Sequence, residues 1–160
     1  KTIKITYGSF LKNMTEKLLV KHYSELTVDQ LHDILQARVE VFVVEQDCVY
    51  QDIDGYDKEA YHVWLEDENK KVLAYCRVLP KGRVRDVSIG RVITTVRGCG
   101  YGLTVMQAAI DTARRVYGDA LIRIEAQKYA KGFYEKLGFK QDSDDFLEDG
   151  IPHIEMIHKM

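Results

Sequence analysis

Three alternating glycines, Gly98, Gly100 and Gly102, stand between a strand-like segment (residues 87–96) and an apolar run with helical spacing. Glycine lets backbone N–H groups approach an oxyanion closely, and a helix N-terminus adds partial positive charge. This stretch therefore predicts a loop that binds a phosphate or pyrophosphate. The dinucleotide-binding pattern and the P-loop are both excluded, because no third glycine and no Gly-Lys-Ser/Thr ending follow. A glycine-rich surface turn closed by a helix is the alternative for this stretch alone.

A second motif lies in residues 127–139 (QKYAKGFYEKLGF), after a strand-like LIRIEA at residues 121–126. Together with Arg97-x-x-Gly100-x-Gly102, this motif resembles the Gcn5-related N-acetyltransferases. In that family, the first motif binds the pyrophosphate of an acyl-coenzyme A. The positions that match the second motif are Gln127 (in place of the usual Asn), Ala130, Phe133, Tyr134, Gly138 and Phe139.

Three further stretches are similar to the ElaA-type branch of the family: residues 41–57, 89–93 (IGRVI) and 148–156 (EDGIPHIEM). The resemblance begins near Met14, so we expect a single N-acetyltransferase domain over residues 14–160. Residues 1–13 are expected to be an N-terminal extension, and we assign them no function.

The resemblance implies an α/β (α+β) fold with a mixed, partly antiparallel sheet that splays open in the middle and carries helices on both faces. The opening is expected where residues 86–95 meet residues 121–126, and acetyl-coenzyme A or coenzyme A would lie in it. The resemblance implies these cofactor-binding residues: Val92, Ile93, Thr94, Arg97, Gly98, Cys99, Gly100, Tyr101, Gly102, Leu103, Gln127, Ala130, Phe133 and Tyr134.

Acyl transfer to an amine needs a proton for the leaving thiolate and a base for the ammonium. The family position of Tyr134 implies the general acid, with a core tyrosine as the alternative. Candidate bases are Glu45, Glu125, His62 and His153, each of which could instead be an ordinary surface or satisfied polar group. Our first choice is Glu45, because the acidic stretch 45–57 is expected to border the acceptor side of the cleft, opposite the phosphate loop.

Arg77 and Arg91 lie inside otherwise apolar strands, where a buried cation requires a partner. They pair either with the acidic stretch or with a carboxylate of the substrate. The expected substrate contacts are Glu45, Gln46, Asp54, Arg77, Arg91 and His153. No metal site is expected, because His153 and His158 fall on opposite faces of a strand and the acidic stretch does not fit a calcium-binding loop.

Local patterns predict the elements that must position these residues. Thr27-Val-Asp-Gln30 is a capping box that opens a helix. One face of this helix is expected to pack in the core, with the apolar residues Leu31, Ile34, Leu35, Val39 and Phe42. Strands are expected at residues 17–23, 61–66, 71–79, 86–95, 121–126 and 153–158, and further helices at 102–117 and 130–137.

The composition limits the function classes. The chain has 160 residues, 46% of them apolar, and a net charge of −2, which favours one globular domain and argues against nucleic acid as a partner. Three widely spaced cysteines indicate free thiols in a reducing compartment. No apolar run is long enough to span a bilayer, so we expect a soluble cytoplasmic protein. The sequence leaves a homodimer open.

We therefore expect a coenzyme A-dependent N-acyltransferase that acts on a small-molecule or peptide amine. A non-catalytic acyl-coenzyme A binding or sensing module is one alternative, although the presence of Tyr134 favours an enzyme. An acyl-homoserine lactone synthase is another, suggested by Arg38, Phe42 and Glu45. It ranks lower, because that family lacks the glycine-rich loop.

Overall fold

The structure is a computed structural model that describes residues 3–4, 15–118 and 121–159. One mixed sheet runs through it in the order β1-β2-β3-β4-β5-β6-β9-β7, with β8 paired to β9, and only β5 and β6 are parallel. The strands are β1 (Ile3–Lys4), β2 (Lys17–His22), β3 (Tyr61–Glu66), β4 (Val72–Leu79), β5 (Val87–Thr94), β6 (Ile122–Gln127), β7 (Lys140–Gln141), β8 (Phe146–Glu148) and β9 (Ile151–His158).

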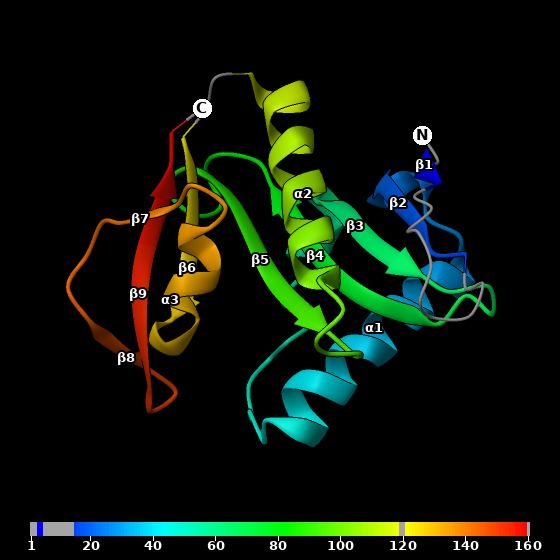
Figure 1. Ribbon diagram of the computed structural model, residues 1–160, viewed down its shortest axis with the longest axis horizontal. Coiled ribbons are helices and arrows are strands. Elements are labelled where there is room, and N and C mark those ends of the chain that lie inside the picture. Colours follow the sequence, from blue (N-terminus) through cyan, green and yellow to red (C-terminus); the bar gives the residue numbers. More distant parts are fainter. Residues whose placement is uncertain (1–2, 5–14, 119–120, 160) are drawn as a thin grey trace.

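Helices cover both faces of this sheet (Figure 1). The long helix α2 and the short α3 lie on one face, and α1 lies on the other. The helices are α1 (Val28–Val39), α2 (Tyr101–Tyr117) and α3 (Lys131–Glu135), and the shorter turns are η1 (Tyr23–Glu25), η2 (Glu40–Glu45), η3 (Tyr56–Glu59) and η4 (Lys128–Ala130). The expected mixed α/β fold is confirmed.

The capping box at Thr27 starts α1 as predicted, because its hydroxyl accepts from the N–H of Gln30 while the Gln30 side chain accepts from the N–H of Thr27. The helix then continues as the π-helical turn η2, where the N–H of Gln46 reaches back five residues to the carbonyl of Val41. The prediction that Val39 faces the core is wrong, since its side chain is exposed. Its neighbour Arg38 is buried in an ion-pair network instead.

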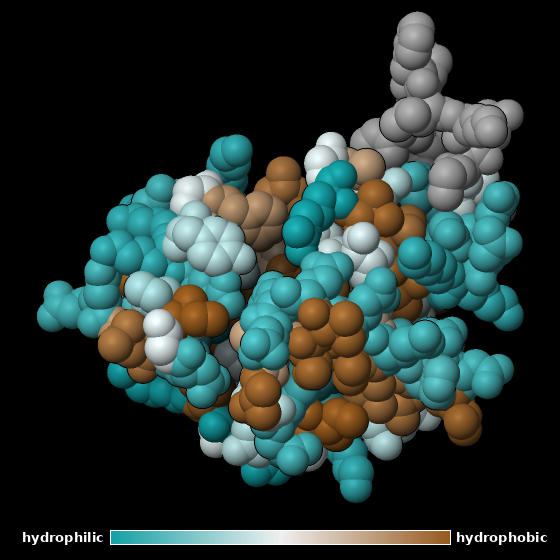
Figure 2. All heavy atoms as spheres, turned by 90° about the horizontal axis from the view of Figure 1, so that it is seen from below, coloured by the Kyte–Doolittle hydropathy of each residue, from teal (hydrophilic) through white to brown (hydrophobic). Residues whose placement is uncertain are grey.

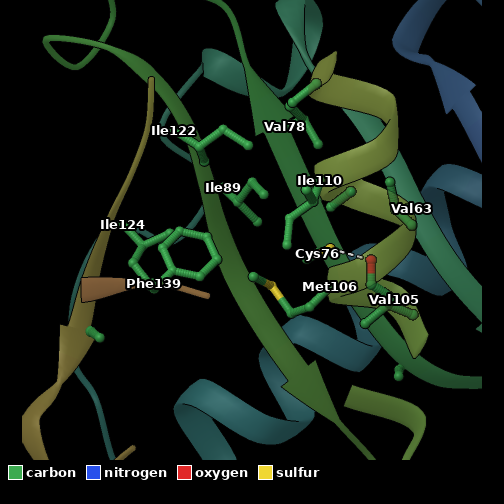
Figure 3. Close-up of a cluster of buried hydrophobic side chains, with 14 of the residues drawn as sticks. Val63, Cys76, Val78, Ile89, Val105, Met106, Ile110, Ile122, Ile124 and Phe139 are labelled. Atoms are coloured by element: carbon green, nitrogen blue, oxygen red, sulfur yellow. Dashed lines mark hydrogen bonds between the residues drawn. The ribbon is translucent and has the colours of Figure 1, made fainter. Parts of the chain in front are cut away.

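The main core lies between α2 and the sheet (Figure 3). Met106 and Ile110 of α2 pack over Cys76 of β4 and Ile89 of β5, and Phe139 closes the cluster at the β6 side. The Cys76 thiol donates to the carbonyl of Val105 at 3.5 Å, so this sulfur is held within the core. A second core, with Trp64 and Tyr75 at its centre, packs beneath α1.

Strands β5 and β6 part almost as soon as they meet. Only Val87 pairs with Ile122 and Ser88 with Arg123, although β5 is eight residues long. On its other edge β5 stays paired with β4, through a β-bulge at which Arg91 takes a left-handed conformation (φ 55°). The splay expected between these two segments is confirmed.

The hairpin formed by β8 and β9 was missed at the sequence level. Its two-residue turn is Asp149-Gly150, with φ values of 50° and 76°, between the paired residues Glu148 and Ile151. Asp-Gly is among the strongest hairpin signals, because both turn residues require positive φ. The signal was therefore present in the sequence. The hairpin places Glu148 and Asp149 beside the opening between β5 and β6.

The surface mixes hydrophilic side chains with hydrophobic patches on the face shown in Figure 2. Exposed large apolar residues include Val44, Val49, Tyr129 and Leu147. Within the expected extension, Ile3 and Lys4 pair with Leu18 and Lys17, and the remainder of residues 1–13 lies outside the described part of the chain.

Candidate active site

A cleft of about 330 Å³ opens where β5 and β6 part. This volume is at the small end of the range usual for ligand sites. One wall comes from β4, β5 and the segment after α1, and the other from β6, η4, α3 and the β8–β9 hairpin. The predicted site residues that line it are Gln46, Arg77, Arg91, Val92, Gln127, Ala130, Tyr134 and His153.

The glycine-rich loop lies outside the enclosed part of the cleft, between the end of β5 and α2. Gly98 and Gly100 have φ values of 79° and 74°, which explains why glycine is needed at both positions. No side chain caps α2, and among the described residues no protein group accepts from the amides of its first three residues, Tyr101 to Leu103. These N–H groups can therefore bind an anion.

Gly102 also has a packing role, and its place in the phosphate site stays a prediction. It is buried, and a Cβ at this position would lie 3.3 Å from the ring of Phe133 and 3.4 Å from Cγ2 of Thr94. The absence of a side chain thus lets α2, α3 and β5 come together. Phe133 and Thr94 adjoin Gly102 at the start of α2, and their contacts with the cofactor stay predictions.

The strand before the loop offers backbone groups to the cleft. The N–H of Thr95 donates to the carbonyl of Leu73, on the side of β4. Because the N–H groups of successive residues in a strand point to opposite edges, the N–H of Thr94 points to the edge that faces β6. No strand of the described chain pairs with β5 on that edge beyond Ser88. Val92 lines the cleft, whereas the Ile93 side chain is buried under α1.

Tyr134 projects from α3 into the cleft and packs edge-on against Phe133 and Phe139, at centroid distances of 5.0 and 6.1 Å. Its hydroxyl has no hydrogen-bond partner among the described residues. Burial, followed by the neighbouring Cys76 and Tyr129, raises the pKa of Tyr134 well above its usual value. The phenol is therefore neutral near neutral pH and holds a proton that it can donate.

The sequence predicted that Glu45 lies across the cleft from the phosphate loop. In the structure it lies beside this loop instead. Its Oε2 accepts from Arg97 at 2.7 Å, in an exposed ion pair, and Glu45 does not line the cleft. This contact joins residues 52 positions apart and orients the guanidinium of the loop. The role of Glu45 as a base stays an untested prediction, and its location does not favour it.

His62 is fully buried and serves the core. Its Nε2 donates to the carbonyl of Asp57 at 3.0 Å, so Nδ1 accepts from the Tyr75 hydroxyl at 2.8 Å. Burial lowers the pKa of this imidazole, which keeps it neutral. It does not line the cleft.

Glu125 is the candidate base that the geometry favours. It lies on β6, lines the cleft and has no ion-pair partner among the described residues. Partial desolvation, followed by the nearby Glu148 and Glu155, raises the pKa of Glu125, against the opposing effects of His153 and Arg91. A carboxylate whose pKa is raised toward neutrality is better suited to accept a proton from an ammonium.

The acidic stretch pairs with the buried arginines. Arg38 donates to Asp52 at 2.9 Å and to Asp57 at 2.8 Å, both from a fully buried position. Arg77 bonds to Asp57 at 2.9 Å and also to Asp54.

Arg91 completes this network. Its Nε lies 2.7 Å from Asp52 Oδ1, and its other end bonds to Asp54 at 3.2 Å. The guanidinium also stacks over Tyr50, 5.2 Å from the ring centroid. Three arginines thus face three aspartates, so of the two alternatives for Arg77 and Arg91 the structure shows the pairing with the protein's own carboxylates. Asp54 belongs to this network and does not line the cleft.

The residues present fit a coenzyme A derivative. The uncapped amides at the start of α2 suit a pyrophosphate, and the unpaired edge of β5 suits an extended amide-containing arm. Tyr134 lines the cleft beside that edge. Among the described residues, no group of histidines, cysteines and carboxylates could hold a metal ion, and no helix could cross a membrane.

Comparison with known proteins agrees with this geometry: residues 19–160 match the family model described as Acetyltransferase (GNAT) domain. The chain belongs to the GNAT family and is an N-acetyltransferase of the ElaA type. ElaA of Escherichia coli is 40% identical over 146 residues, which cover 87% of this chain and 94% of ElaA.

Solved structures give the same result. The crystal structure of E. coli ElaA superposes with a TM-score of 0.83 at 37% identity, covering 90% of this chain and 99% of that one. An acyl-CoA N-acyltransferase from Pseudomonas aeruginosa gives a TM-score of 0.83 at 38% identity, covering 88% and 97%. A CoA-dependent acyl-homoserine lactone synthase shares the fold alone, with a TM-score of 0.72 at 14% identity over 88% and 81% of the two chains.

Proposed function

We propose that this N-acetyltransferase transfers an acetyl group from acetyl-coenzyme A directly to a primary amine of a small molecule or peptide, in the cytoplasm. The observation that carries the proposal is the position of Tyr134, which lines the cleft between the parted strands and whose hydroxyl has no hydrogen-bond partner within the described part of the chain. Bound acetyl-coenzyme A supplies the activated thioester.

The chain's own residues supply binding and proton transfer. The amides at the start of α2, together with Arg97, hold the pyrophosphate, and the free edge of β5 near Thr94 holds the arm. Tyr134 donates its proton to the departing sulfur. Glu125 accepts the proton of the acceptor ammonium, directly or through water, which leaves a neutral amine to attack.

A binding or sensing module without turnover is the weaker alternative, because such a module has no need of a tyrosine hydroxyl in the cleft. An acyl-homoserine lactone synthase is weaker still. The relative of that class shares only the fold, and Arg38, on which the likeness depended, is fully occupied by Asp52 and Asp57.

A screen of amines with acetyl-coenzyme A, following release of free thiol, tests the proposed function. We expect thiol release that depends on the amine and on the enzyme, with an acetylated amine recovered in equal amount. Calorimetry with coenzyme A is the companion measurement. Tight binding without turnover of any amine would favour the sensing module, and absence of both would refute the cofactor assignment.

A further inference from the structure

The cleft wall formed by β6 and the β8–β9 hairpin carries acidic groups that the protein does not neutralise. The cationic side chains nearby are already engaged: Arg91 by Asp52 and Asp54, and Arg123 by Asp86, Asp142 and Glu155. By contrast, Glu125 and Asp149 have no ion-pair partner among the described residues. Glu148 has only an imidazole nearby.

That imidazole provides the second, independent observation. His153 is only 9% exposed, lines the cleft and stacks on Phe146 at a centroid distance of 6.0 Å. Its Nδ1 lies 2.8 Å from the carbonyl of Ile151, and because a carbonyl only accepts, Nδ1 carries the proton of the neutral ring. In this tautomer Nε2 carries a lone pair, and none of the described residues donates a hydrogen bond to it.

The lone pair of Nε2 lies 3.6 Å from Oε2 of Glu148, which in its charged form can also only accept. The two acceptors, one on a buried ring and one on a half-exposed carboxylate, face the cleft side by side, and no group among the described residues donates to both. An ammonium group has three N–H donors and a positive charge, so it can donate to both at once. An anionic or purely apolar group would meet repulsion or leave both acceptors unsatisfied.

This ammonium position neighbours the position of the reacting nitrogen but is formed by other side chains. Glu125 faces the cleft from β6, the strand that parts from β5, whereas Glu148 and His153 belong to the hairpin on the far side of β6. We propose, building on the proposed function, that the acceptor is an aliphatic diamine or polyamine. One nitrogen is acetylated next to Glu125 and Tyr134, while a second, still charged, donates to Glu148 and His153.

The test compares 1,4-diaminobutane with n-butylamine, which has the same carbon chain and a single charge. With acetyl-coenzyme A at saturation, we expect kcat/KM for the diamine to exceed that for the monoamine by about tenfold or more, the scale of one hydrogen bond to a charged group. In Glu148→Gln this ratio should fall toward one. The matched control is Glu135→Gln, because Glu135 is an exposed carboxylate on α3 outside the cleft, and the ratio should stay as in the parent.

A binding measurement separates this inference from the function on which it rests. Titration of 1,4-diaminobutane into enzyme saturated with coenzyme A involves no turnover, and we expect binding that Glu148→Gln weakens about tenfold. Equal use of both amines, or a ratio that Glu148→Gln leaves unchanged, would overturn the diamine inference while acetylation itself stands. Loss of coenzyme A binding in the parent would instead refute the proposed function.

Discussion

A single hydroxyl distinguishes Tyr134 from the phenylalanines that surround it. Replacing Tyr134 with Phe keeps the edge-on packing against Phe133 and Phe139, so the fold and the affinity for acetyl-coenzyme A should persist. Turnover should fall about 100-fold or more, the scale of a lost general acid. Steady-state kinetics and calorimetry on the same variant check both parts. An unchanged rate would make Tyr134 a packing residue.

Two glutamates compete as the base, and parallel Gln substitutions distinguish them. Glu125→Gln should lower the rate at neutral pH about 100-fold or more. In the parent, the acidic limb of the rate profile should lie above the usual range of a glutamate, because the pKa of Glu125 is raised and only the deprotonated form accepts a proton.

Glu45→Gln is the comparison. It should leave the shape of the profile intact and act mainly on coenzyme A affinity, because Glu45 orients Arg97. A profile that changes in Glu45→Gln and not in Glu125→Gln would restore the original choice of base.

At the scale of the elements, two glycines of one loop should respond differently. In Gly100→Ala, the left-handed conformation costs about 1–2 kcal/mol or the loop turns its amides away, so coenzyme A affinity should fall about tenfold. Gly102→Val should instead lower the free energy of unfolding by about 1–3 kcal/mol, because the added methyls press on Phe133 and Thr94. Calorimetry and urea unfolding of both variants check this. Unchanged coenzyme A affinity in Gly100→Ala, or unchanged stability in Gly102→Val, would contradict it.

Elements with a strong local signal were predictable from the sequence: the capping box at Thr27 and the glycine-rich loop are fixed by neighbouring residues. The partner of Arg97 was not, because Glu45 is 52 positions away and reaches the loop only through the π-helical turn after α1. The burial of Arg38 likewise depends on aspartates that follow it by 14 and 19 positions. The site wall at Glu148 was missed because the Asp-Gly turn was read as part of a family motif and not as a hairpin.

At the scale of the whole molecule, the arginine–aspartate network ties the segment after α1 to the sheet. Burial alone would raise the pKa of Asp54, but hydrogen bonds from Arg77 and from the N–H of Tyr56 lower it to about 2. Because its pKa is lower in the folded state than in the unfolded state, this carboxylate makes its full contribution to stability above about pH 4, the usual pKa of an aspartate. The contribution is lost as the pH falls through about 2.

We therefore expect the free energy of unfolding to decline between about pH 4 and pH 2, and Asp54→Asn to flatten that decline while lowering stability at neutral pH. Urea unfolding across this range measures both. A matched Asp144→Asn change, at an exposed aspartate outside the network, should leave the curve as in the parent. A decline that Asp54→Asn does not alter would place the acid sensitivity elsewhere.

The brief meeting of β5 and β6 also bears on how the molecule opens. Only two residue pairs join the parallel strands β5 and β6. We therefore expect local opening of the part that contains β6 to β9 and α3 to need less free energy than local opening of the part that contains β2 to β5. Backbone amides of the first part should exchange with deuterium sooner. The phosphate loop belongs to one part and Tyr134 to the other. If coenzyme A contacts both parts as proposed, it should raise the free energy of that opening and so also hold the two parts together.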